Sequence, residues 1–151
     1  MKFSITLRLP LFCLIMLAMG CSPKPPVEED IAQFNGDWIA ASVEEKGRKL
    51  DAKAASYVTV SILSGKFHRI DANPAKFISH GECGFTINTK QTPTHFDLVQ
   101  LEGDKVGLTT EGIVSKEGAE LKLCFAEPGK PRPKEFTAND KNVLMVLELK
   151  K

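Results

Sequence analysis

Aromatic side chains are scarce in this chain of 151 residues, which has one Trp, one Tyr and nine Phe. So few Trp and Tyr argue against a specialised aromatic ligand pocket. An excess of charge is also missing. Because Lys2 and Arg8 precede Cys21, 18 basic side chains follow that cysteine, against 19 acidic ones. A near-neutral domain lacks the basic surface that binds nucleic acid or an anionic membrane, so we expect no nucleic-acid partner.

Recognisable catalytic motifs are missing as well. There is no Gly-x-Ser-x-Gly turn and no Ser-x-x-Lys, and Cys124 has no recognisable histidine partner. The Ser64-Gly65-Lys66 segment lacks the glycine frame of a phosphate-binding loop. We therefore predict that the chain is not an enzyme and needs no cofactor. An enzyme of unrecognised type remains a third alternative.

The segment with His80, Glu82 and Cys83 comes nearest to a metal site. Zinc needs three or four converging ligands, and no second cluster of such residues is visible. His68 and His95 fall on separate predicted strands. We therefore predict that residues 80–84 form a solvated loop and that the protein holds no metal.

The first residues have the pattern of an export signal. Two positive charges precede an apolar run at 9–19, which is too short to cross a bilayer but suits the core of a signal peptide. Small residues before Cys21, Gly20 among them, resemble the lipobox of bacterial lipoproteins. The resemblance implies that Cys21 becomes the first mature residue and carries acyl chains. An ordinary secretory signal and a retained membrane helix are the alternatives.

Three regions follow from this pattern. Residues 1–20 are a predicted signal peptide, 21–30 are the lipidated cysteine and a proline-rich tether, and 31–151 are one domain, a size that suits a single core. We expect an exported protein, anchored by lipid to the cell envelope and facing the periplasm or the exterior. Ser22 is not the acidic residue that some bacteria use to retain lipoproteins at the inner membrane, which favours the outer membrane.

Beyond residue 31 the hydrophobic periodicity is mostly two, and turn signals separate the alternating segments. We expect one helical turn near Asp51–Ser56. No long segment has helical periodicity, so the sequence predicts an all-β fold, an antiparallel barrel or sandwich. The expected strands are 37–44, 57–63, 66–71, 85–88, 95–100, 105–114, 119–126 and 143–149.

Three segments in order (36–47, 88–98 and 112–136) resemble a family of uncharacterised domains that is abundant in planctomycete bacteria and described as lipocalin-like. The resemblance implies a small antiparallel barrel of about eight strands and supplies no established activity. It also implies that Gly36 and Trp38 open the first strand and close the barrel floor beneath a cation. Arg132 and Lys150 are the candidates for that cation.

Apolar side chains that share a strand face are candidates for the barrel interior. Small barrels either fill their interior with side chains or hold one small ligand. We therefore expect a non-enzymatic binding or interaction module with a small apolar ligand or an envelope protein as partner. A structural or inhibitory envelope protein that acts through its outer surface is the alternative. The interior candidates are Val58, Val60, Ile62, Leu121, Leu123 and Phe125.

Cys83 and Cys124 are the two cysteines of the domain. Export implies an oxidising compartment, in which a disulfide is reasonable. Closing a loop of roughly 42 residues would stabilise the fold by about 4 kcal/mol in the chain-entropy model. The alternative is that Cys124 is merely a small residue on a strand, and the sequence leaves both open.

Overall fold

The computed structural model describes residues 28–151, so the predicted signal peptide, Cys21 and most of the tether lie outside the described residues. Within these described residues, two short helices and nine strands follow one another. In the described part, no helix is long and apolar enough to span a bilayer. The elements are α1 (Glu28–Ala32), β1 (Gly36–Glu45), β2 (Arg48–Lys49), α2 (Ala52–Ala55), β3 (Val58–Leu63), β4 (Lys66–Asn73), β5 (Lys76–Asn88), β6 (Thr94–Gln100), β7 (Thr109–Glu117), β8 (Glu120–Ala126) and β9 (Asn142–Leu149).

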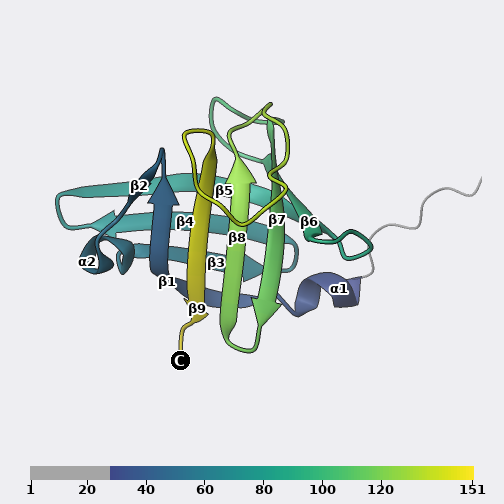
Figure 1. The fold of residues 1–151 in the computed structure, drawn as a ribbon, viewed down its shortest axis with the longest axis horizontal. Helices are drawn as coiled ribbons and strands as arrows, with labels where there is room; N and C mark the ends of the chain where they lie inside the picture. The colour runs from purple at the N-terminus through teal and green to yellow at the C-terminus, as the bar shows by residue number, and fades with distance from the viewer. Residues whose placement is uncertain (1–27) are drawn as a thin grey trace, which may run out of the picture.

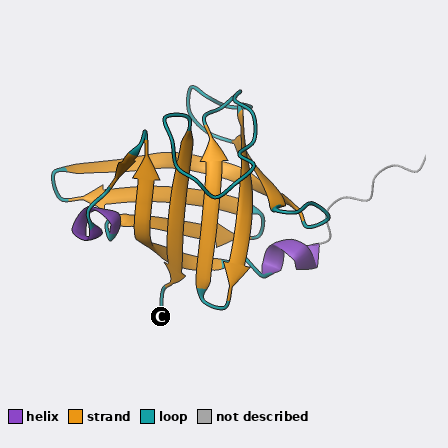
Figure 2. Cartoon of the chain, viewed as in Figure 1, coloured by secondary structure: helices purple, strands orange, loops and turns teal. Residues whose placement is uncertain are grey.

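Eight of the strands form a closed antiparallel barrel, which confirms the predicted fold class. Each strand from β3 to β9 pairs with the next one along the chain, and β1 pairs with both β3 and β9. β2 adds a short hairpin to the end of β1. The near strands β1, β9, β8 and β7 cross the far strands β3, β4 and β5 at a steep angle (Figures 1 and 2). The barrel closes entirely within the described residues, which therefore build their own core.

Side chains alternate between the inside and the outside of the barrel wall. Along β3, for example, Val58, Val60 and Ile62 are buried, while the residues between them are half-buried. The inward side chains of all eight strands join one hydrophobic core. The interior is therefore filled over most of its height.

The two ends of the barrel differ. At the end where β1 begins, which we call the floor, the Phe34 ring packs edge-on against Phe85, with 6.1 Å between the ring centroids. Phe34 follows α1 and is itself buried. At the opposite end, which we call the mouth, β1, β4, β6 and β8 run out into loops. The loop between β6 and β7 and the segment after β8 gather at the top of the view in Figure 1.

Residues 127–141, which we call the strap, connect β8 to β9 and lie against the outer wall. Arg132 joins the strap to β6 and β7: Nη1 donates hydrogen bonds to the carbonyl oxygens of Phe96 (2.7 Å) and Gly112 (2.5 Å). Its Nη2 donates to the carboxylate of Asp97 at 2.6 Å. The strap therefore covers part of the barrel surface.

Three local expectations need correction. Residues 80–84, expected as a solvated loop, lie within β5, where Gly81 with φ of +75° marks an irregularity in the pairing with β4. Positive φ is readily adopted by glycine, so the strand bends there without ending. β7 begins at Thr109 rather than at 105. Residues 28–30 of the predicted tether begin α1, while the prolines that favour extended chain all precede residue 27.

The expected helical turn is confirmed as α2, with Asp51 as its N-cap.

Candidate ligand site at the barrel mouth

A cavity of about 200 Å³ remains at the mouth, where the hydrophobic core stops short of the barrel rim. Apolar side chains from β4, β6 and β8 form its walls, and the loop that leads into β7 contributes the half-exposed Leu108. Polar groups reach it from the rim. The lining residues are Phe67, Arg69, His80, Cys83, Leu98, Gln100, Lys105, Leu108, Thr110, Phe125 and Pro128.

Arg69 is the buried charge of this site, with 8% of its surface exposed. It follows Phe67 on the inward face of β4, and Asp71 comes two residues later on the same face. Arg69 donates from Nε to Oδ1 of Asp71 (2.8 Å) and from Nη2 to Oδ2 (2.9 Å), a bidentate pair. Glu45 Oε2 lies 3.7 Å from the same Nη2. Burying a guanidinium is tolerated because these carboxylates balance its charge.

Asp71 also contacts His80, whose Nε2 lies 3.1 Å from Oδ2. Burial by itself would raise the pKa of Asp71. Hydrogen bonds from His80 and Arg69, together with the positive charge of Arg69, outweigh burial and lower the pKa from 3.8 to about 2. Asp71 is therefore ionised at neutral pH and holds Arg69 in a fixed orientation at the cavity.

The two cysteines of the domain are both free, which decides between the alternatives that the sequence left open. Cys83 belongs to the interior core, and its Sγ donates to Oε1 of Gln100 at 3.4 Å. Cys124 faces the strap, and its Sγ donates to the carbonyl oxygen of Thr137 at 3.5 Å. The thiols thus lie on opposite sides of the wall, where no disulfide can join them. Burial raises the pKa of each thiol, so both are inert at neutral pH.

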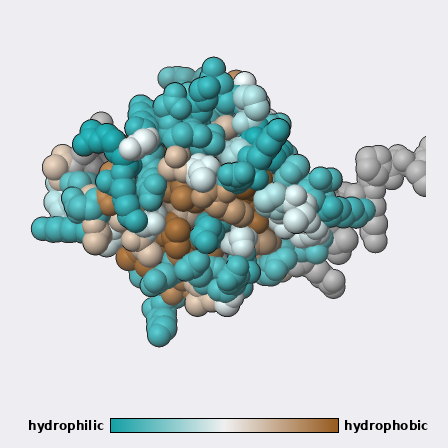
Figure 3. Space-filling model, in the orientation of Figure 1, coloured by the Kyte–Doolittle hydropathy of each residue, from teal (hydrophilic) through white to brown (hydrophobic). Residues whose placement is uncertain are grey.

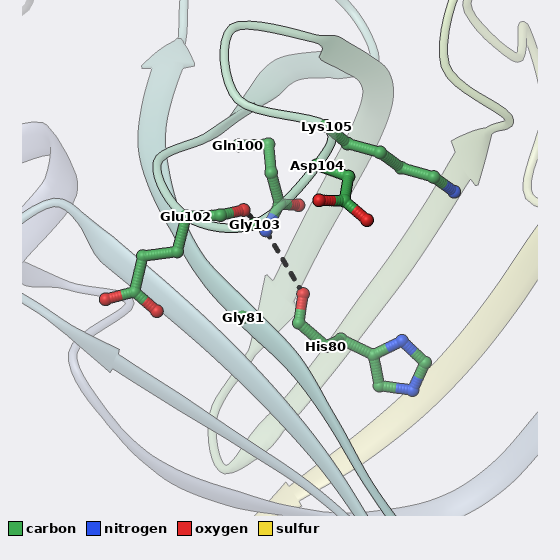
Figure 4. Close-up of a pocket in the computed structure, with 7 residues that line it drawn as sticks. All are labelled: His80, Gly81, Gln100, Glu102, Gly103, Asp104 and Lys105. Atoms are coloured by element: carbon green, nitrogen blue, oxygen red, sulfur yellow. Dashed lines mark hydrogen bonds between the residues drawn. The ribbon is translucent and has the colours of Figure 1, made fainter.

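A second hollow, of about 390 Å³, lies beside the mouth between β5 and the loop after β6. Gln100 crosses it, donating its amide to the carbonyl oxygens of His80 (3.2 Å) and Glu102 (3.1 Å). The carboxylates of Glu102 and Asp104 extend to opposite sides of Gln100 (Figure 4). Within residues 28–151, no three His, Cys, Asp or Glu side chains lie together as metal ligands would. The hollow has no apolar wall, so a ligand there would stay largely in water.

Trp38 lies fully buried at the floor end of β1, and its Nε1 donates to the carbonyl oxygen of Phe34 at 3.1 Å. Gly36 leaves room for a neighbour: a Cβ on it would lie 2.6 Å from Cδ1 of Leu149. The expectation that a cation lies beneath Trp38 needs correction. Arg132 is bound to β6 and β7, whereas Trp38 pairs with Val60 on β3 and Leu149 on β9. Arg132 therefore anchors the strap instead.

Lys150, the other candidate cation, follows β9 and donates its backbone N–H to the carbonyl oxygen of Asp37. The cation that lies over an aromatic ring in the described chain is Lys122, with Nζ 6.0 Å from the centroid of Phe136. The six interior candidates all belong to the core or pack against it: Val58, Val60, Ile62, Leu121, Leu123 and Phe125.

Sequence reasoning missed the Arg69 cluster. A signal was present, because Arg69 and Asp71 follow Phe67 at a spacing of two and so share its inward face. Charged residues on the inward face of a strand are costly unless they are paired, which marks them for attention. The contribution of Glu45 and His80 could not be read from spacing, because they lie on β1 and β5.

No protein-family model matches this chain, and searches of curated proteins and of solved structures found no similar one. The chain defines a closed eight-stranded antiparallel barrel with a polar cluster at one end. The resemblance to the planctomycete-abundant family stays a prediction.

Proposed function

We propose that the protein is an exported, lipid-anchored, non-enzymatic barrel that binds one small ligand at its mouth. The cavity beside Arg69 carries this proposal. Enclosed apolar walls with a few polar groups at fixed positions are what small-molecule sites have in common. Phe67, Leu98 and Phe125 supply the walls, and Arg69 supplies a polar group that its carboxylate partners hold still.

The size of the cavity limits the ligand. About 200 Å³ is below the roughly 300–1,000 Å³ of pockets for drug-sized molecules, so the occupant is small or stays partly outside the rim. The filled core beneath leaves the ligand no path toward the floor. A carrier or sensor of a small metabolite fits this geometry better than a carrier of long lipids.

Native mass spectrometry of the chain from residue 22 to 151, purified without detergent, tests the binding role. An adduct of metabolite mass that disappears in Thr110→Trp, a substitution that fills the cavity from its rim, is the expected result. Ser115→Trp is the matched control, because residue 115 lies on the same strand away from the cavity. An adduct that survives in Thr110→Trp would place the ligand elsewhere.

The anchor is a separate part of the proposal and rests on the residues around Cys21. Metabolic labelling with an alkyne-bearing fatty acid should modify the wild-type protein and leave Cys21→Ser unlabelled. Cys83→Ser, which removes a buried thiol of the barrel, should keep the label. Absence of label from the wild-type chain would refute lipidation.

A second candidate, an envelope protein that acts through its outer surface, is favoured by the front wall of the barrel. Apolar side chains gather at the centre of Figure 3, over β8 and β9. Leu144 and Val146 alternate along β9 with the buried Met145 and Leu147 and are themselves half-buried. Exposed apolar area of this kind is typical of protein contacts. Cross-linking in cells through a photoreactive residue at position 146 should capture one partner if this role is the right one.

A further inference from the structure

The chemistry of the cavity lining indicates what kind of ligand the mouth takes, and this inference rests on the proposed function. Arg69 presents one edge of its guanidinium to Asp71, through Nε and Nη2. The Nη1 group has no acceptor among the described residues, although every buried side-chain nitrogen and oxygen there has a partner. Nη1 therefore keeps some accessible surface, and Arg69 is one of the residues that line the mouth cavity.

This leaves the two N–H donors of Nη1 available to an acceptor that is bound in the cavity. The bidentate pair with Asp71 fixes the plane of the guanidinium, so the free edge is already oriented before a ligand arrives. Pre-orientation reduces the entropy that binding has to overcome. An acceptor placed on Nη1 would make charge-assisted hydrogen bonds, which are about twice as strong as neutral ones.

The sign of charge around the cavity separates anionic from neutral ligands. Arg69 and Lys105 line the cavity, whereas no carboxylate is among the lining residues. Asp71 and Glu45 contact Arg69 but do not line the cavity. Although these two carboxylates balance the charge of Arg69, the charged side chains that a ligand would contact directly are cations, which favours an anion over a neutral acceptor.

The walls and the volume define the rest of the molecule. Phe67, Leu98 and Phe125 offer an apolar surface below the cations, so an apolar body attached to the anion would be buried. At the packing density of protein interiors, about 0.74, the cavity accommodates roughly 150 Å³ of ligand atoms. A single short alkyl or aryl group fits this space.

We propose that the mouth cavity binds a small amphiphilic carboxylate. The carboxylate lies on Nη1 of Arg69 and on the ammonium of Lys105, and the apolar body packs against Phe67, Leu98 and Phe125. Asp71 is a positioning residue: it holds the guanidinium so that Nη1 faces the ligand.

Titration calorimetry with octanoate and with octanol tests this proposal on the chain from residue 22 to 151. Octanoate should bind about tenfold or more tightly than octanol, because hydrogen bonds between two charged groups are stronger than hydrogen bonds to a neutral hydroxyl. Lys105→Gln should weaken octanoate by roughly threefold and leave octanol unchanged. Lys130→Gln, an exposed strap residue outside the cavity lining, is the matched control and should change neither.

Arg69→Lys supplies the second variant. It keeps a cation beside Asp71 but removes the free edge of the guanidinium, so the preference for octanoate over octanol should shrink, with folding checked by cooperative melting. If octanol binds as tightly as octanoate in the wild-type chain, the carboxylate inference is wrong while a ligand site at the mouth stands. If neither binds, the carboxylate inference and the binding role at this cavity both fail.

Discussion

A buried arginine has large consequences for the barrel mouth. Arg69 loses most of its hydration, and two carboxylates, those of Asp71 and Glu45, restore the balance of charge. Removing one partner of such a pair typically costs about 3–5 kcal/mol, because the other charge is left buried. Replacement of Arg69 by an apolar residue of similar length would leave Asp71 with only its contact to His80. A single substitution at Arg69 or at Asp71 is therefore expected to change the stability of the whole cluster.

Acid should weaken the fold through Asp71. The pKa of its carboxyl is about 2 in the folded protein and 3.8 without the fold's contacts. A carboxylate with a lowered folded pKa stabilises fully above the unfolded pKa and loses that contribution as pH falls from about 5 toward 2. Urea unfolding at pH 5 and at pH 3 should show a decrease in the free energy of unfolding. The decrease should be smaller in Asp71→Asn, and an equal decrease in both would contradict the assignment.

Unlike the charged Arg69 and Asp71, Trp38 is a largely apolar side chain, and it is completely buried. We expect Trp38→Ala to destabilise the barrel by about 3–5 kcal/mol, since it empties the floor and removes the hydrogen bond to Phe34. Trp38→Phe keeps a ring there and should lose less. Thermal melting followed by circular dichroism measures both. Unchanged melting of Trp38→Ala would show that the floor does not depend on this residue.

The strap is the element whose position depends most on one side chain. Arg132 is bound to two carbonyl oxygens and to Asp97, all on β6 and β7. Glu111 Oε1 lies 3.8 Å from its Nη2. Beneath the strap, Cys124 is fully buried on the outer face of β8. The strap thus shields an apolar part of the wall that would otherwise face water.

Release of the strap should therefore expose Cys124 without opening the barrel. In Arg132→Gln, we expect alkylation of Cys124 in the native protein to be about tenfold or more faster, because charged hydrogen bonds of roughly 1.5–3 kcal/mol are lost. Peptide mapping by mass spectrometry follows the rate. Cys83, which lies inside the barrel, is the internal control. An equal increase at Cys83 would mean that the substitution loosens the whole fold.

At the scale of the whole molecule, closure joins the first strand to the last one. β9 pairs with both β1 and β8, so the last strand completes the sheet that the first one begins. Leu147 pairs with Ala40 on one side and with Leu121 on the other, and all three are buried. Without β9, the strands β1 and β8 would be open edges of the sheet with unpaired backbone groups.

Truncation at the C-terminus tests this dependence. Removal of residues 147–151 deletes the pairings of β9 with Trp38 and Ala40 and should abolish cooperative melting. Removal of Lys151 alone, which lies beyond the strand, should leave the melting temperature within a few degrees of wild type. A cooperative transition in the longer truncation would show that seven strands and part of the eighth suffice.

Most of the strands could be predicted because each alternates between two environments. The segment with Leu121, Leu123 and Phe125 has this pattern without interruption, and the structure places it as β8. β5 could not be predicted over its full length, because Gly81 and Gly84 interrupt the alternation and the bend at Gly81 accommodates them within a continuous strand. A glycine in the sequence is compatible with a turn or with a bulge, and only the pairing with the neighbouring strand shows which of the two forms.

The sequence by itself determined the all-β fold, eight strand segments and the inward faces of β3 and β8, because side-chain direction in a strand follows from spacing alone. Tertiary structure decided which residues meet. Closure brings Glu45, Arg69 and His80 together from three strands, and it places Cys83 and Cys124 on opposite sides of the wall. Distances across a barrel depend on how the whole sheet curves, and no local pattern in the chain records that curvature.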